Sequence, residues 1–198
     1  ARYATANDYS HVLLLDQDTH FPPSAAEVYN KNLCCKSISS PILKLSNGYA
    51  FSPCSRKGFK TKGVCLSPGI YNLSDYSPVN SGMCIPLNIF DSVGGYNENI
   101  RLDFADFEFI SRCKSVCSSL TILPIVAVQN FSNEETDVNK LLFRYKLYLE
   151  SALGARWPAF KEKVFMHIEI LCHTMSLTRR TKSISFIKMY IKDFLQNK

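Results

Sequence analysis

The sequence predicts an α/β fold in which a mixed sheet is flanked by helices and followed by C-terminal helices. Short apolar runs between turn residues, typical of strands, occur throughout residues 1–135. Helical spacing of apolar residues dominates residues 136–198. With 46% hydrophobic and 20% charged residues, the chain can bury a sizeable core. We therefore expect a sheet-containing domain over 1–135 and a helical extension over 136–198.

The first third of the chain alternates strand and turn signals. The continuous apolar run VLLL at 12–15 predicts a strand that is buried on both faces. Ser24 with Glu27 three residues later forms a capping-box pattern and predicts a helix in SAAEVYNKNL. Asn47-Gly48 inside ILKLSNGYAF predicts a hairpin. Residues 54–78, rich in Ser, Gly, Lys and Pro, predict a loop with short strands at most.

The remaining segments carry equally clear boundary signals. VNSGMCI predicts a strand whose glycine marks a close approach to a ligand, and Pro86 opens a helix that ends at Gly94-Gly95. A further helix is expected from Phe104 onward, and LTILPIVAV is expected to be a buried strand in which Pro124 marks an edge or a bulge. The C-terminal helices are expected in DVNKLLFRYKLYLESALG, KEKVFMHIEILCHTMSL and RRTKSISFIKMYIKDFLQNK.

The composition and the net charge of the chain predict where the protein is located and which partners it could bind. The eight cysteines include no CxxC pair and the four histidines have no zinc-motif spacing, which favours reduced thiols. No signal-peptide pattern and no run of about 20 apolar residues is present, so we expect a cytoplasmic protein. The formal net charge of +6 is compatible with phosphate-bearing ligands or an anionic membrane. We expect no nucleic-acid partner.

Two carboxylates follow the first predicted strand. Residues i and i+2 of an extended chain point the same way, so Asp16 and Asp18 can present both carboxylates to one point. Such a pair is repulsive unless a cation or a donor group lies between them. Mg²⁺ or Mn²⁺, itself bridging phosphate oxygens, is the natural occupant. The alternative is a solvated turn in which these acids cap the following segment.

Two chemistries use a strand-ending Asp-x-Asp. In haloacid-dehalogenase phosphohydrolases the first Asp is the nucleophile and a Thr stands two residues past the second. Here Thr19 follows Asp18 directly and His20 holds that position, which disfavours a phosphohydrolase. The other chemistry is glycosyl transfer from a nucleotide-sugar, in which the acids hold the metal–diphosphate.

Three segments, taken in order, are similar to one family. LLLDQDTHFP resembles the Asp-x-Asp segment of family-two inverting glycosyltransferases of GT-A (Rossmann-like) fold, closest to the rhamnosyltransferase-like branch. VNSGMCIPLNIFDSVGGYNENIRLDFADFEFISRC resembles that family's pattern of Ser-Gly, an apolar helix, Gly-Gly-Phe/Tyr, an acidic turn and Asp-x-Glu leading to Arg. FRYKLYLESAL resembles more weakly the aromatic/arginine segment that follows. The resemblance covers residues 1–155. It implies inverting transfer from a nucleotide-diphosphate sugar donor to a saccharide or lipid-linked acceptor, in bacterial surface polysaccharide biosynthesis.

The resemblance also assigns the catalytic base. Inverting transfer needs a base that deprotonates the acceptor hydroxyl. The family's base corresponds to Asp106, with Asp103 and Glu108 as nearby alternatives. A fourth reading is that these acids only complement a helix dipole.

The resemblance further assigns the metal and the donor pocket. It places Asp18 in contact with the metal and Asp16 on the nucleotide side or behind the metal, and Asn80, Ser81 and Gly82 along the donor-sugar pocket. A histidine that the family often places after the LTILPIVAV strand is replaced here by Gln129 or Asn130. Both residues are weak metal ligands.

The chain departs from the family at its beginning. The family's fold opens with strand–helix–strand units that bind the nucleotide base, whereas this sequence reaches Asp16 after one short segment. We therefore expect a GT-A domain truncated at its N-terminus, of which residues 1–135 are the C-terminal part. An inactive remnant or a binding module is the alternative to an active transferase.

The C-terminal segment is basic and amphipathic. It carries six Lys or Arg residues between Arg179 and Lys198, and Phe186, Ile187, Tyr190, Ile191 and Phe194 form an apolar stripe. A cationic amphipathic helix can lie on an anionic membrane, which would suit a lipid-linked acceptor at the inner face of the membrane. The alternative is a helix packed on its own domain with a solvated basic face.

Overall fold

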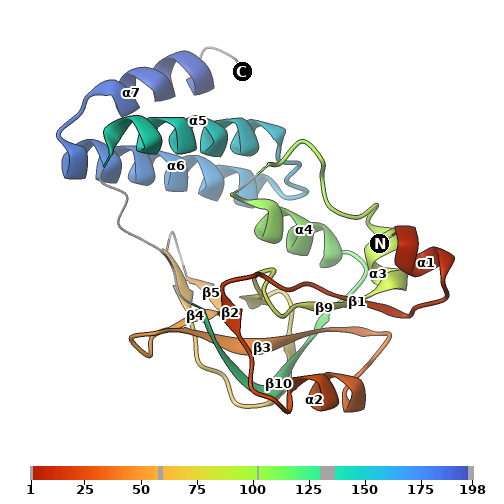
Figure 1. Cartoon of the computed structure of the whole chain (residues 1–198). Helices are drawn as coiled ribbons and strands as arrows, with labels where there is room; N and C mark the ends of the chain where they lie inside the picture. Colours follow the sequence, from red (N-terminus) through yellow and green to blue (C-terminus); the bar gives the residue numbers. More distant parts are fainter. Residues whose placement is uncertain (1, 58–59, 102, 130–136, 196–198) are drawn as a thin grey trace. The chain divides into compact units, whose positions relative to one another are not determined.

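The computed structural model describes residues 2–57, 60–101, 103–129 and 137–195, drawn in Figure 1. The chain divides into two compact units. The first unit comprises Ala1–Gly95 and Phe109–Ser132, and the second comprises Tyr96–Glu108 and Asn133–Lys198.

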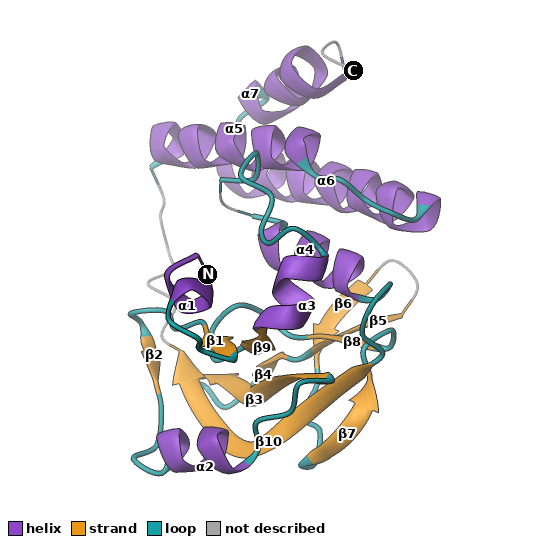
Figure 2. Ribbon diagram, turned by 90° about the vertical axis from the view of Figure 1, so that its right-hand side faces the viewer, coloured by secondary structure: helices purple, strands orange, loops and turns teal. Residues whose placement is uncertain are grey.

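The first unit is built on a seven-stranded mixed sheet (Figure 2). Its strands follow the spatial order β1-β9-β3-β10-β2, with β4 paired to β3 and β7 paired to β10. Their bounds are β1 His11–Leu13, β9 Cys84–Pro86, β3 Ser37–Leu45, β10 Ser119–Gln129, β2 Thr19–His20, β4 Ala50–Ser52 and β7 Gly69–Asn72. The predicted mixed sheet flanked by helices is confirmed.

The strand directions show at which edge of the sheet the carboxyl ends of the parallel strands lie. The central strands β3 and β10 are parallel, whereas β9 is antiparallel both to β3 and to β1. Strands β1, β3 and β10 therefore run in the same direction. Their carboxyl ends, after Leu13, Leu45 and Gln129, lie at one edge of the sheet, which is where open α/β sheets bind ligands.

Helices cover both faces of this sheet (Figures 1 and 2). On one side, α2 (Ala25–Lys31) packs Ala25 and Tyr29 against Cys84, Leu123 and Ile125. On the other side lie α3 (Leu87–Ser92) and the later part of α4 (Ala105–Cys113). Phe90 of α3 meets Phe109 of α4, with ring centroids 5.6 Å apart.

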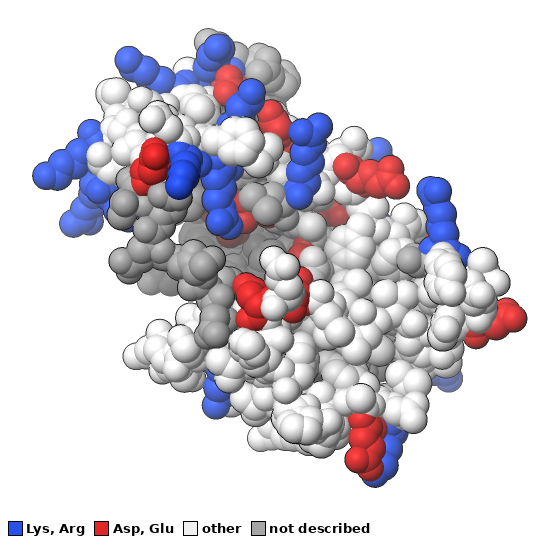
Figure 3. Space-filling model, in the orientation of Figure 1, with Lys and Arg blue, Asp and Glu red and all other residues white. Residues whose placement is uncertain are grey.

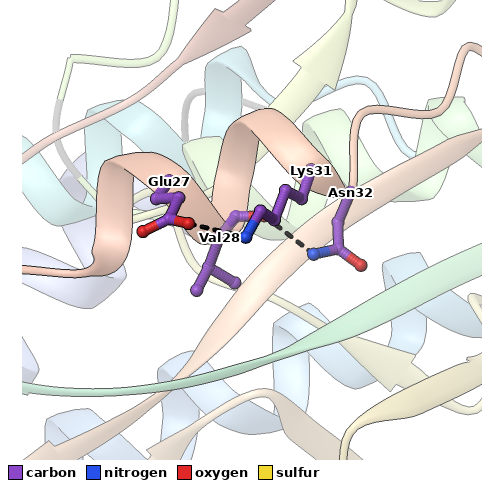
Figure 4. Close-up of polar contacts among 4 residues, drawn as sticks. All are labelled: Glu27, Val28, Lys31 and Asn32. Atoms are coloured by element: carbon purple, nitrogen blue, oxygen red, sulfur yellow. Dashed lines mark hydrogen bonds and ion pairs between the residues drawn. The ribbon is translucent and has the colours of Figure 1, made fainter.

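Helix α2 begins where the sequence predicts, but without the predicted capping box. Ser24 has the right-handed helical conformation and makes no side-chain cap hydrogen bond, since its backbone already continues the helix. Glu27 pairs instead with Lys31 one turn later, at 2.6 Å. Asn32 donates to the carbonyl oxygen of Val28 and ends the helix (Figure 4).

The predicted hairpin is confirmed. Strands β3 and β4 are antiparallel and joined by a turn in which Gly48 has φ 86°. The Asn47 side chain accepts from the Tyr49 amide at 3.1 Å and fixes the turn. Residues 54–78 contain short strands, as expected: β5 Cys54–Lys57, β6 Lys60–Gly63 and β8 Tyr76–Ser77 form a separate three-stranded sheet.

Two strand predictions need correction and one is confirmed. The VLLL strand is not buried on both faces: β1 covers only His11–Leu13, lies at the sheet edge and leaves Leu13 and Leu15 exposed by 38% and 60%. The strand expected in VNSGMCI is limited to β9, because residues up to Met83 form a turn. The prediction that Pro124 marks an edge or a bulge is confirmed, because the register of β10 on β3 shifts between Ile122 and Val126.

The second unit is a helical assembly. It contains α5 (Val138–Gly154), α6 (Phe160–Thr181), α7 (Ser185–Met189) and a π-helical turn, η1 (Tyr190–Leu195), and Figure 1 shows α5 and α6 side by side. Its core includes Phe104, Tyr145, Leu149, Ile170 and Phe186. The carboxylate of Asp137 caps α5 by accepting from the amides of Asn139 and Lys140.

The C-terminal segment does not form the single helix that the sequence predicts. Helix α6 runs on to Thr181 and is broken at Lys182, which has φ 54°. Phe186 of α7 is fully buried, and its ring packs on Tyr145 with centroids 5.5 Å apart. Part of the apolar stripe therefore belongs to the core of the second unit.

Two features concern the chain's chemical setting. All eight cysteines lie in the described residues and none of them forms a disulfide. Among the residues described, the structure has no helix with the length and apolarity required to span a bilayer.

A short helix, α1 (Arg2–Ala6), precedes β1.

Candidate functional site

Acidic and amide side chains meet at the carboxyl edge of the sheet. Asp16 and Asp18 follow β1, and Gln129 is the last residue of β10. Strand β2 pairs antiparallel with the end of β10, so that Thr19 stands opposite Gln129. This pairing folds the segment after Asp18 back along β10 and brings the acids to Gln129.

Gln129 contacts the acidic pair through its side chain. Its amide nitrogen donates to Oδ1 of Asp18 at 2.9 Å. The same side chain lies near enough to Asp16 to lower the pKa of that carboxyl group. Gln129 is 6% exposed, whereas Asp18 is half-buried and Asp16 exposed. The donor group that a close pair of carboxylates needs is therefore supplied by the protein itself.

The pKa of Asp16 reflects this arrangement. Partial desolvation of the carboxylate is the largest cause and raises its pKa, and the negative charge of Asp18 raises it further. The neighbouring amide of Gln129 acts in the opposite direction and lowers the pKa, because it stabilises the ionised carboxylate. The shift has the sign expected for two carboxylates that share one small space.

The segment Asn80–Gly82 adjoins the acidic segment. The hydroxyl groups of Thr19 and Ser81 are 2.6 Å apart, and Ser81 is fully buried. The Gly82 amide donates to the carbonyl oxygen of Leu14 at 2.8 Å, and the Leu14 amide donates to that of Met83 at 3.0 Å. Five of the six predicted site residues, namely Asp16, Asp18, Asn80, Ser81 and Gly82, thus lie in neighbouring segments of the first unit.

Gly82 has a structural reason to be glycine. Its φ is +75°, and an added Cβ would lie 2.6 Å from Cγ of Pro41. The hydroxyl group of Tyr29 donates to the Gly82 carbonyl oxygen at 2.6 Å. Gly82 therefore lies close to Pro41 and Tyr29 of this chain.

The sixth predicted site residue belongs to the second unit. Asp106 is half-buried in the first turn of α4, and the alternatives Asp103 and Glu108 belong to the same unit. Glu108 is fully buried. Burial raises the pKa of Asp103, and the positive charges of Arg144 and His173 partly offset the shift.

The acidic pair suits a hard divalent cation that other ligands help to hold. Mg²⁺ and Mn²⁺ favour carboxylate oxygens and complete their coordination with phosphate oxygens and water. Within the described ranges, no group of three or more His, Cys, Asp or Glu side chains could hold a metal ion. Asp16 and Asp18 provide two carboxylates of the kind that such an ion binds. Asn130 lies outside the described residues.

Two contacts at this site escape prediction from the sequence. Tyr29 reads as a helix residue, and nothing local indicates that its hydroxyl reaches Gly82. Gln129 stands out only by its place after a strand, whereas its contact with Asp18 joins residues 111 positions apart. A pairing between Thr19-His20 and the end of β10 would have been the signal, but a two-residue strand has no recognisable pattern.

Comparison with known proteins gives a distant likeness only. No family model and no curated protein sequence matches the chain. One matching solved structure is the "Crystal structure of GalNAc-T7 with UDP, GalNAc and Mn2+", with 12% sequence identity and a TM-score of 0.45. The match covers 84% of this chain and 39% of that one. A likeness of this size carries no argument about activity.

Proposed function

We propose that the chain is part of a metal-dependent inverting glycosyltransferase of GT-A fold that uses a nucleotide-diphosphate sugar. The observation that carries the proposal is the meeting of two motifs 62 positions apart, through the Thr19–Ser81 hydrogen bond. The family resemblance assigns one motif to the metal–diphosphate and the other to the donor sugar. Their contact at the carboxyl edge of the sheet supports that assignment.

Each residue has a proposed role. Asp18 contacts Mg²⁺ or Mn²⁺, Asp16 lies on the nucleotide side, and the metal stabilises negative charge on the departing diphosphate. Asn80, Ser81 and Gly82 line the donor pocket. Asp106 is the base that removes the proton from the acceptor hydroxyl, a role that the family resemblance supports.

The acceptor is proposed to be a saccharide or a lipid-linked saccharide in bacterial surface polysaccharide biosynthesis, at the cytoplasmic face of the membrane. Residues 156–198 contain nine Lys or Arg and three Asp or Glu, a net charge of +6 that equals that of the whole chain. Figure 3 shows Lys and Arg side chains gathered over the helical unit. Anionic lipid headgroups complement this charge.

Helix α6 offers the apolar part of a membrane contact. Phe160, Val164, Leu171 and Met175 recur at helical spacing and are exposed by 82%, 36%, 47% and 55%. Leu171 and Met175 line a pocket together with Arg179 and Arg180. Because Phe186 is buried, we assign the contact to this face of α6 in place of the predicted stripe on the C-terminal segment.

Vesicle co-sedimentation tests the membrane contact. We expect binding to vesicles that contain anionic lipid, no binding to neutral vesicles, and loss of binding in R179E/R180E. The variant K36E, which changes an exposed lysine of the first unit, serves as the matched control and should bind like the wild type. Equal sedimentation of all proteins with neutral and anionic vesicles would remove the membrane proposal.

The catalytic proposal is tested by incubating a panel of nucleotide-diphosphate sugars, including dTDP-rhamnose, with Mn²⁺ and saccharide acceptors. We expect release of nucleoside diphosphate, reduced about 10²–10⁴-fold in D106N, the range that general base catalysis contributes. D18N should lose activity at low Mn²⁺. Intact nucleotide-sugar in every reaction would favour an inactive remnant. Phosphate release from a phosphomonoester would favour a phosphohydrolase.

A further inference from the structure

The amide of Gln129 lies where the chemistry of the acidic pair calls for a positive group. Two carboxylates repel each other unless a cation or a hydrogen-bond donor relieves their charge. A glutamine amide nitrogen carries two N–H groups, so one side chain can serve both acids. Gln129 donates to Oδ1 of Asp18 at 2.9 Å and lies near the carboxylate of Asp16.

Gln129 is held in this position by the fold. Its backbone stands opposite Thr19 in the pairing of β10 with β2, directly after Asp18. The residue is 6% exposed, and a buried amide is costly to leave without partners. The same short pairing therefore fixes both the donor and one of its acceptors.

We infer that Gln129 acts as a built-in substitute for the cation: its amide relieves the charge of the acidic pair through Asp18 and competes with a divalent metal ion for these carboxylate oxygens. The inference rests on the proposed metal role of this pair. A cation that uses the same oxygens must displace hydrogen bonds to charged groups, which are stronger than neutral ones. Metal binding by this chain is therefore weak until a diphosphate adds its own oxygens.

Two isosteric variants test the competition, with Mn²⁺ alone as the probe and free Mn²⁺ measured by electron paramagnetic resonance. Q129M keeps the side-chain volume but removes the hydrogen-bond donor. We expect this variant to bind Mn²⁺ about ten-fold more tightly than the wild type. This factor corresponds to about 1.4 kcal/mol of hydrogen bonding that the metal no longer has to displace. Q129E adds a third carboxylate and should bind more tightly still.

Controls make the effect specific. Q17M changes the exposed glutamine between the two acids and should leave Mn²⁺ affinity unchanged. In a D18N background, Q129M should have little further effect, because its partner has lost its charge. Thermal melts of each variant confirm that the compared proteins are folded.

The outcomes separate this inference from the proposed function. Weaker Mn²⁺ binding by Q129M would mean that the amide oxygen of Gln129 is a ligand, which overturns the inference. Unchanged affinity, or no Mn²⁺ binding by any variant at millimolar metal, overturns it as well. Tighter binding by both variants with no nucleotide-sugar turnover would leave the inference standing and count against the glycosyltransferase.

Discussion

Gly82 combines a backbone requirement with a packing requirement. Its φ of +75° lies in the left-handed region, and its missing side chain leaves room for the ring of Pro41. Its carbonyl oxygen accepts from Tyr29 and its amide donates to Leu14. These contacts hold the neighbouring Ser81 against Thr19, so Gly82 supports the site through its backbone.

Replacement of this glycine should therefore destabilise the fold. We expect Gly82→Ala to lower the free energy of unfolding by about 2–4 kcal/mol, as the sum of left-handed strain and overpacking. Gly48→Ala is the matched control, because Gly48 has φ +86° but no atom within 4 Å of an added Cβ. Urea denaturation measures both. Equal losses in the two variants would show that the contact with Pro41 does not matter.

For single residues, the sequence indicates which side chains are candidates for the site, but it does not indicate which residues they contact. Asp16, Asp18 and Ser81 can be chosen as candidate site residues from the sequence. Two acids directly after a strand, combined with a Ser-Gly pair further along the chain, seldom have a purely structural role. Gln129 and Tyr29 acquire their importance from contacts that only the folded chain creates. Polar residues of this kind are common in strands and helices, so their type alone carries no signal.

At the scale of elements, helix α2 and strand β9 form a buried contact that contains two ionisable groups. Cys84 is 4% exposed, and burial raises the pKa of its thiol to about 11. Burial also raises the pKa of Tyr29, with a further contribution from the neighbouring Cys84. Both groups are therefore neutral in the folded protein at moderately alkaline pH.

This contact predicts a loss of stability at high pH. Between about pH 8.5, where an unfolded thiol ionises, and pH 11, the folded protein retains a proton that the unfolded chain has lost, so unfolding becomes easier. One such proton changes stability by at most about 1.4 kcal/mol per pH unit.

Urea denaturation of C84A between pH 8 and 10 tests this expectation. C84A should show a shallower decline than the wild type, whatever its stability at pH 8, although Tyr29 still contributes. C34A, which removes an exposed cysteine, is the control and should decline like the wild type. A C84A slope equal to that of the wild type would contradict the assignment of the decline to Cys84.

Elements with explicit turn or period signals are predicted well. Asn47-Gly48 gives the hairpin, Pro124 gives the bulge in β10, and helical spacing gives α5. VLLL at 12–15 misleads, because a short apolar run does not reveal whether its strand lies inside a sheet or at its edge. The C-terminal segment misleads for a related reason. Its apolar stripe has the same sequence pattern whether it packs on the protein's own core or on another surface.

For the whole molecule, the sequence anticipates the mixed sheet flanked by helices. Two motifs that are distant in sequence are expected to share one ligand, and the Thr19–Ser81 contact joins their segments. The sequence does not reveal the donor that relieves the acidic pair, because the pairing of β2 with β10 depends on the entire sheet. Asp106 belongs to the second unit, so its role remains a prediction.

The proposed function requires one site in the first unit at which a divalent cation and a nucleoside diphosphate bind together. Paramagnetic broadening of backbone amide signals by Mn²⁺, recorded with and without the diphosphate, tests it most directly. We predict that the signals of Asp18, Thr19, Ser81 and Gln129 broaden first, and at lower Mn²⁺ when the diphosphate is present. Broadening that is centred elsewhere, or that is indifferent to the diphosphate, would contradict the account.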